Sequence, residues 1–108
     1  MAYYLGQAAY TAEASATLIK NPQNRREVVR EPIEKLGGRL EGFWFALGEY
    51  DAVLIYQLPD NITAAALSMA VAAGGAVKAF KTTPLMTAEE AVEAMKKATG
   101  TGYRPPTK

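Results

Sequence analysis

The chain has 108 residues, with twelve basic and eleven acidic side chains that leave a net charge of +1. This length suits one domain with a single hydrophobic core. The balanced charge gives no electrostatic reason to expect nucleic acid or an anionic membrane as a partner. The chain contains no cysteine and no histidine. Disulfides, thiolate chemistry, the commonest general base and most transition-metal sites are therefore excluded, and we expect neither a metal nor a cofactor.

The sequence also lacks the signals of membrane insertion and export. No apolar run approaches the roughly 20 residues that a helix needs to cross a bilayer. Residues 1–5 have neither the basic start nor the apolar stretch of a signal peptide. We therefore expect a cytoplasmic protein.

The first part of the chain predicts a strand and then a short helix. Residues 3–10 are rich in tyrosine and small apolar residues, which is typical of a strand. Thr11 suits the N-cap of a helix over residues 12–19. Pro22 ends this helix, because the residue before a proline is pushed out of the helical region.

A second helix is predicted over residues 24–36, with a proline in its middle. Pro32 predicts a kink or a restarted turn, and Gly37-Gly38 ends the helix. Four apolar residues recur at helical spacing and should face the core: Val28, Val29, Ile33 and Leu36. The arginines Arg25, Arg26 and Arg30 favour a solvated face. An anion site would require them to converge with Lys78 or Lys81.

The middle of the chain predicts an antiparallel hairpin. Residues 39–47 and 52–58 form its strands, and Gly48-Glu49-Tyr50-Asp51 is the short turn between them. Simple alternation on the first strand gives two sets of side chains, namely Phe43, Phe45 and Leu47 on one face and Leu40, Gly42, Trp44 and Ala46 on the other.

The second half predicts a helix, a strand and a further helix. Asp60 can cap a helix over residues 61–73, and Gly74-Gly75 ends it before a strand over residues 76–83. Thr87 and Glu90 have the spacing of a capping box and begin the last helix. We expect the domain to span residues 1–99 and to be followed by an irregular tail over residues 100–108.

This element order predicts an α+β, ferredoxin-like βαββαβ fold with an extra C-terminal helix and a four-stranded antiparallel sheet. Both hairpin strands are apolar on both faces, yet the helices of this fold cover only one. We expect a second copy to cover the other face, which gives a dimer or a higher homo-oligomer. The alternative is a monomer in which the C-terminal helix covers that face.

The run Leu47-Gly48-Glu49-Tyr50-Asp51-Ala52-Val53 resembles the signature for which the GYD domain family is named. Gly37-Gly38 before the hairpin, Pro59-Asp60 after it and an alanine-rich helix leading to Gly74-Gly75 extend this resemblance over most of residues 3–98. It implies a small bacterial or archaeal protein, related to the dimeric α/β-barrel group. In that group two ferredoxin-like sheets face each other, and its members include cofactor-free monooxygenases, small isomerases and haem enzymes. This chain lacks the histidine that the haem branch uses as its iron ligand.

The hairpin holds the candidate ligand-binding residues, which are Tyr50, Asp51, Glu49, Trp44 and Tyr56. In a functional interpretation they line a pocket, where a carboxylate beside apolar strands has a raised pKa and acts as a base. In a structural interpretation Gly48 takes a positive φ, Asp51 bonds backbone N–H groups, and Trp44 and Tyr56 pack on opposite faces. Asp60 and Thr87 are predicted as helix caps.

Two functions follow from these observations. The first is a binding or regulatory module without catalysis of its own, which the lack of histidine and cysteine favours. The second is a cofactor-independent enzyme, similar to a monooxygenase or an isomerase, that acts on a small aromatic or polyketide-like molecule. In that case Tyr50, Asp51 or Trp44 would position the substrate.

Overall fold

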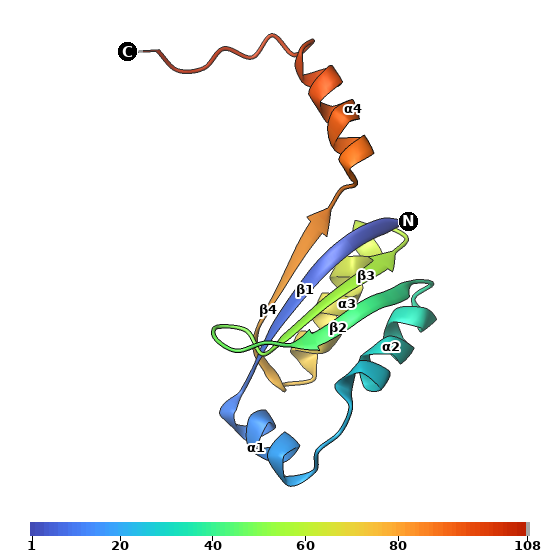
Figure 1. The fold of residues 1–108 in the computed structure, drawn as a ribbon, viewed down its shortest axis with the longest axis vertical. Helices are drawn as coiled ribbons and strands as arrows, with labels where there is room; N and C mark the ends of the chain where they lie inside the picture. The colour runs from blue at the N-terminus through green and yellow to red at the C-terminus, as the bar shows by residue number, and fades with distance from the viewer. Residues whose placement is uncertain (108) are drawn as a thin grey trace.

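One antiparallel sheet with the strand order β2-β3-β1-β4 forms the centre of the molecule (Figure 1). This computed structural model describes residues 1–107. The strands are β1 (Ala2–Tyr10), β2 (Arg39–Phe45), β3 (Ala52–Leu58) and β4 (Val77–Leu85). The strand order and the antiparallel pairing confirm the ferredoxin-like prediction.

The helices are α1 (Ala12–Lys20), α2 (Arg25–Lys35), α3 (Asn61–Ala73) and α4 (Ala88–Ala98). Each begins at a residue whose side chain accepts a bond from a free backbone N–H of the first turn. These caps are Thr11, Asn24, Asp60 and Thr87, so the predicted roles of Asp60 and Thr87 are confirmed. Thr87 and Glu90 form the complete capping box.

Two strands end at residues other than those predicted. β2 ends at Phe45, and residues 46–51 form the loop. β4 continues to Leu85 because its last residues pair with the start of β1, where Leu85 lies opposite Tyr3. Pro84 is tolerated there because β4 is an edge strand.

Helix α2 is continuous through Pro32, so the predicted restarted turn is absent. Proline removes one backbone donor, but the helix resumes its bonding one turn later. The N–H of Leu36 donates to the carbonyl of Pro32 at 3.1 Å. Ile33, the residue after the proline, is fully buried in the core. Packing of this side chain offsets the lost hydrogen bond.

The predicted facing of β2 was wrong at its start. A register shift between Leu40 and Gly42 makes Glu41 an extra residue in the strand. Leu40 then pairs with Tyr56, and Phe43 pairs with Leu54, and both partners are buried. Leu40 and Phe43 therefore share the helix-covered face, which strict alternation cannot show.

The core lies between this face and helices α2 and α3. Its buried residues are Tyr4, Ile33, Leu54, Tyr56, Leu58, Ala64 and Leu67. The rings of Tyr4 and Tyr56 stack with centroids 5.8 Å apart. Gly38, between α2 and β2, is required here because a side chain would collide with the carbonyl oxygen of Gln57. The two aromatic rings fill one end of the layer between sheet and helices.

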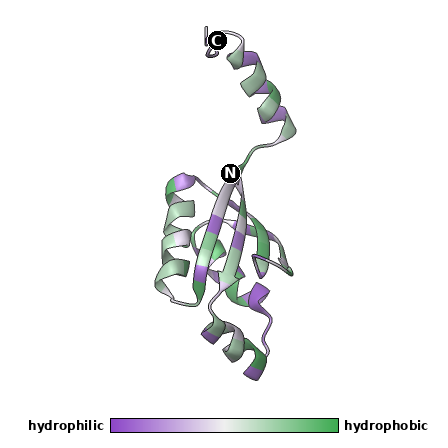
Figure 2. Cartoon of the chain, turned by 90° about the vertical axis from the view of Figure 1, so that its left-hand side faces the viewer, coloured by the Kyte–Doolittle hydropathy of each residue, from purple (hydrophilic) through white to green (hydrophobic). Residues whose placement is uncertain are grey.

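Helix α4 stands away from this body. Figure 2 shows it separated from the sheet by the chain that follows β4. It has no extensive contact with another helix or strand, and none of its residues is buried. The C-terminal helix therefore does not cover the second sheet face, in contrast to the predicted alternative. Residues 101–107 form no helix or strand.

Candidate functional site

The loop between β2 and β3 is tied to the end of β1. Gly48 has φ +119°, as predicted for the turn. The backbone N–H of Asp51 donates to the carbonyl of Ala8 at 2.8 Å, and the Asp51 carboxylate accepts from the backbone N–H of Tyr10, also at 2.8 Å. A bulge between Ala9 and Tyr10 shifts the pairing of β1 with β4 at this point. Asp51 therefore binds backbone, as in the structural interpretation, but on a distant strand.

The other candidate residues of the hairpin do not converge with Asp51 on one pocket. Glu49 is exposed and Tyr50 is half-buried in the loop. Trp44 pairs with Val53 on the uncovered face, where it is 55% exposed, whereas Tyr56 is buried on the other face. The sheet thus separates the two aromatic side chains, which confirms that they have opposite facing.

The hydroxyl of Tyr56 is buried and has no hydrogen-bond partner among residues 1–107. Burial raises the pKa of Tyr56, and the opposing influence of Thr82 on this pKa is smaller. Thr82 is near enough to affect the hydroxyl and its Oγ1 lies 2.8 Å from Ser68 Oγ, but no bond of ordinary hydrogen-bond geometry joins Thr82 to Tyr56. Tyr56 is therefore a packing residue with an unpaired polar atom.

A cavity of about 320 Å³ lies between the sheet and helices α2 and α3, at the end that Tyr4 and Tyr56 do not fill. We call it the inner cavity. It exists because the paired sheet positions beneath it hold the small residues Ala8 and Ala52. Toward the other end of the same face, the corresponding paired positions hold the larger Tyr4 and Tyr56. Its other walls are largely aliphatic and aromatic, as with Val29, Phe43 and Leu67.

A second hollow of about 380 Å³, the outer hollow, lies between α1, the α1–α2 connection and the α3–β4 connection. Four residues line both spaces: Tyr10, Arg25, Gly74 and Ala76. None of the five hairpin candidates lines either space. Sequence reasoning missed Tyr10 as a lining residue, and it considered Arg25 only as part of a cluster of cations. Alanines at buried strand positions, such as Ala8 and Ala52, were the available signal for a hollow.

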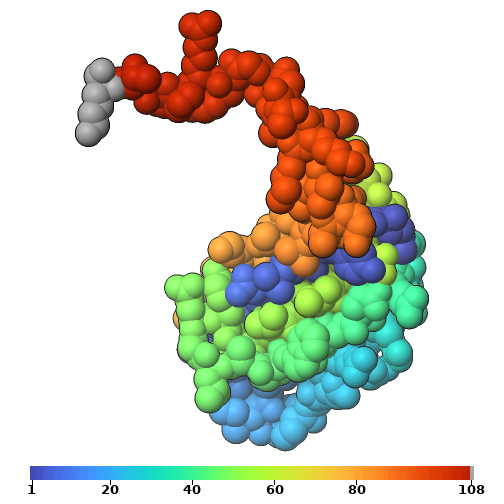
Figure 3. Space-filling view, turned by 45° about the horizontal axis from the view of Figure 1, so that its top comes forward, coloured from blue at the N-terminus to red at the C-terminus, as the bar shows by residue number. Residues whose placement is uncertain are grey.

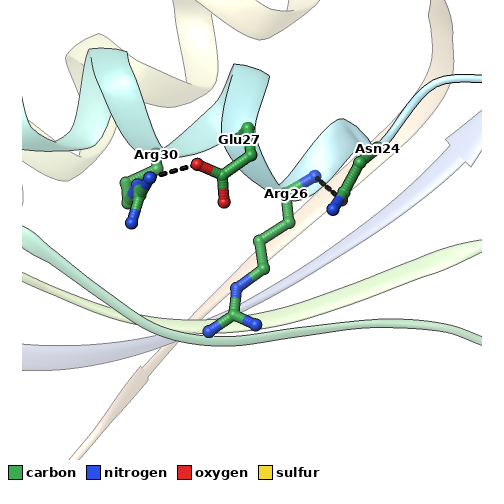
Figure 4. A network of polar contacts seen from close by, with 4 residues as sticks. All are labelled: Asn24, Arg26, Glu27 and Arg30. Carbon is green, nitrogen blue, oxygen red and sulfur yellow. Dashed lines mark hydrogen bonds and ion pairs between the residues drawn. The ribbon is translucent and has the colours of Figure 1, made fainter.

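The arginines of α2 have different environments (Figure 4). Asn24 caps the helix at the backbone N–H of Arg26, and Arg30 forms an ion pair with Glu27. Arg25 alone among them lines the two hollows. Lys78 and Lys81 are exposed and line neither. The several cations that we expected an anion site to require do not converge on either hollow.

The face of the sheet opposite α2 and α3 is uncovered. We call it the open face. Its half-buried or exposed side chains follow from the strand register and are Tyr3, Leu5, Gln7, Arg39, Trp44, Val53, Ile55, Gln57, Ala79, Lys81, Thr83 and Leu85. Figure 3 shows strands β1, β2 and β3 at the surface, with α4 projecting forward above them. The centre of this face is apolar, which is uncommon for a surface that remains in water.

Two further properties limit what the chain can hold. Within residues 1–107 there is no group of three or more acidic side chains placed to bind a metal ion. No helix in the same part of the chain is long and apolar enough to cross a membrane.

Comparison with known proteins agrees with the fold and with the hairpin signature. A protein from Thermus thermophilus, named glutamine synthetase and cystathionine beta-lyase binding protein, is 31% identical over 78 residues, which are 72% of this chain and 82% of that protein. The crystal structure of an uncharacterized NIPSNAP domain protein from Burkholderia xenovorans superposes with a TM-score of 0.52 at 18% identity, covering 82% of this chain and 95% of that one. The family model described as GYD domain matches residues 4–95. The chain therefore belongs to the GYD domain family.

Proposed function

We propose that this chain is a protein-binding module without catalysis of its own, which assembles as a homo-oligomer and binds an enzyme. The open face carries this proposal. Trp44 is 55% exposed there beside Val53, and Ile55 and Leu5 continue the apolar surface on β3 and β1. Exposed tryptophan and aliphatic side chains at the centre of a surface are typical of protein interfaces.

The occupant of the open face in this proposal is a second copy of the chain. The face is broad and continuous over the sheet, and a twofold axis would place it against the same face of the partner. Two sheets would then face each other, as in the dimeric α/β-barrel group. The uncovered state of the face, with α4 standing away from it, supports this arrangement.

Helix α4 is the surface that we assign to the enzyme partner. Val92 and Met95 lie one turn apart and are 47% and 66% exposed, which gives the helix an apolar stripe without a neighbour. Amphipathic helices commonly bind apolar grooves through such a stripe. The relative from Thermus thermophilus, whose name gives glutamine synthetase and cystathionine β-lyase as its partners, supports an enzyme as the class of partner. A cytoplasmic location suits such partners.

Light scattering at micromolar concentration tests the homo-oligomer. We expect a mass that is a multiple of the 11.6 kDa chain. Ile55→Lys places a charge on the open face and should reduce the mass to that of the monomer. Ile62→Lys is the matched control, because Ile62 is 82% exposed on α3, away from that face. A monomer mass for the unchanged protein would remove this part of the proposal.

Binding to purified glutamine synthetase and cystathionine β-lyase from the same organism tests the partner. Biolayer interferometry should show binding to at least one enzyme, and Val92→Lys combined with Met95→Lys should abolish it. Ile62→Lys again serves as the control. Absence of binding to both enzymes at tens of micromolar, or unchanged binding by the α4 variant, would contradict the assignment.

A further inference from the structure

We propose that the inner cavity and Arg25 together form a binding site for a small apolar monocarboxylate. This site is separate from the open face and from α4, and the proposal does not depend on the protein partners described above. It rests on the chemistry of the two adjoining hollows and on the position of Arg25 where they meet.

The inner cavity supplies the apolar part of the site. Its volume of about 320 Å³ is at the small end of ligand pockets, which span roughly 300–1,000 Å³. Val29, Phe43, Leu54, Leu67 and Phe80 contribute apolar surface from the helices and the sheet. Among the described residues that line it, the ionisable side chains are Tyr10 and Arg25. A small hydrocarbon or aromatic body is the chemistry that such walls bind, because burial removes its surface from water.

Arg25 supplies the charge at the junction. It is half-buried, and it lines both the inner cavity and the outer hollow. Its Nη1 donates to Gln23 Oε1 at 2.9 Å, which holds the side chain on one side. The ion pairs within residues 1–107 involve other cations, so no carboxylate of this region lies within ion-pair distance of Arg25. The guanidinium group keeps further donors that can bind a carboxylate with two parallel hydrogen bonds.

The arrangement also fixes the orientation and the charge of the ligand. The apolar body lies in the inner cavity, and the carboxylate lies at Arg25, toward the outer hollow. Glu13 lines that outer hollow and carries a negative charge of its own. A second anionic group on the ligand would approach Glu13 and be repelled, so the site favours a single negative charge.

Isothermal titration calorimetry on the unmodified protein tests the proposal with 3-phenylpropanoate as the probe. Its amide, 3-phenylpropanamide, has the same apolar body and nearly the same shape but no charge. We expect the acid to bind about tenfold or more tightly than the amide, since a hydrogen bond to a charged group outweighs a neutral one by this order. Equal affinity for the two compounds, or no binding of the acid at millimolar concentration, would overturn the proposal.

Three variants locate the site. Arg25→Gln should weaken binding of the acid by about tenfold or more and leave that of the amide unchanged. Arg26→Gln is the matched control, since it removes the same charge from the neighbouring, exposed position of the same helix turn. Ala70→Leu adds volume to the wall of the inner cavity and should weaken both compounds. If Arg25→Gln and Arg26→Gln bind the acid equally well, Arg25 is not the anion site.

The comparison of acid with amide uses only the unmodified protein, so it remains decisive even if a variant does not fold. All measurements use the chain without an enzyme partner. Failure here therefore leaves the proposed protein binding untouched, and failure of the enzyme-binding measurement leaves the carboxylate site untouched.

Discussion

The Asp51 carboxylate accepts a hydrogen bond from the backbone N–H of Tyr10 at 2.8 Å, across 41 positions of sequence. Tyr10 stands at the bulge where β1 changes its register with β4. The bond joins the hairpin loop to the strand end that lines both hollows. The aspartate of the family signature is thus a structural link between two segments of the sheet in this chain.

We expect Asp51→Ala to lower the free energy of unfolding by about 2 kcal/mol, because a hydrogen bond to a charged acceptor is lost and a backbone donor is left without it. Urea denaturation followed by circular dichroism measures this change. Glu49→Ala is the control, since Glu49 is exposed in the same loop and should change stability by less than about 0.5 kcal/mol. Equal effects of the two substitutions would show that the bond to Tyr10 contributes little.

The stacked pair Tyr4 and Tyr56 gives a matched prediction about buried hydroxyl groups. Tyr4 donates to Asn61 Oδ1 at 2.7 Å, whereas Tyr56 has no partner within residues 1–107. Tyr4→Phe should therefore cost about 1 kcal/mol, and Tyr56→Phe should be neutral or stabilising. Both free energies of unfolding are measured by urea denaturation and are compared with the same m value for each variant. A larger loss for Tyr56→Phe than for Tyr4→Phe would contradict the assignment of these bonds.

Asp60 makes stability depend on pH at the acid end. Its bonds to the side chain and the backbone of Thr63 lower the pKa of this carboxyl below its ordinary value of 3.8. A carboxyl whose pKa is lowered in the folded state stabilises the fold when the pH lies above its ordinary pKa. This contribution disappears as the pH falls through the folded-state pKa. The melting temperature of the wild type should therefore fall more steeply below pH 3.8 than that of Asp60→Asn.

Asparagine caps helices about as well as aspartate, so Asp60→Asn should retain α3 at neutral pH and serve as the uncharged control. Asp60→Ala, which lacks an acceptor, should lower the melting temperature at every pH. Identical acid profiles for the wild type and Asp60→Asn would assign the pH dependence to other carboxylates.

Removal of α4 tests whether the body folds without it. A chain that ends at Met86 should unfold cooperatively, with a stability within about 0.5 kcal/mol of the full chain, since α4 has no buried residue and no extensive contact. Circular dichroism should show loss of the corresponding helical signal. Calorimetry checks the stability, and a truncated chain that melts without cooperativity would mean that α4 packs on the body in solution.

Much of the fold could be predicted because its signals are local. Thr11, Asp60 and Thr87 cap helices through bonds that span only three residues, so their spacing in sequence was sufficient. β3 and α3 have the predicted bounds, because period-two and helical patterns end there at Pro59 and Gly74. The composition by itself also excluded cysteine and histidine chemistry.

Other features depend on partners that are distant in sequence, and only the tertiary structure decided them. The bulge at Glu41 reversed the facing of Leu40, because register depends on β3 and on burial against the helices. The five hairpin residues lie on two faces and a loop, whereas Arg25 and Tyr10 meet at a cavity that small side chains of separate strands leave open. Local patterns therefore determined the elements of this GYD domain, and packing between elements determined where its surfaces and its cavity lie.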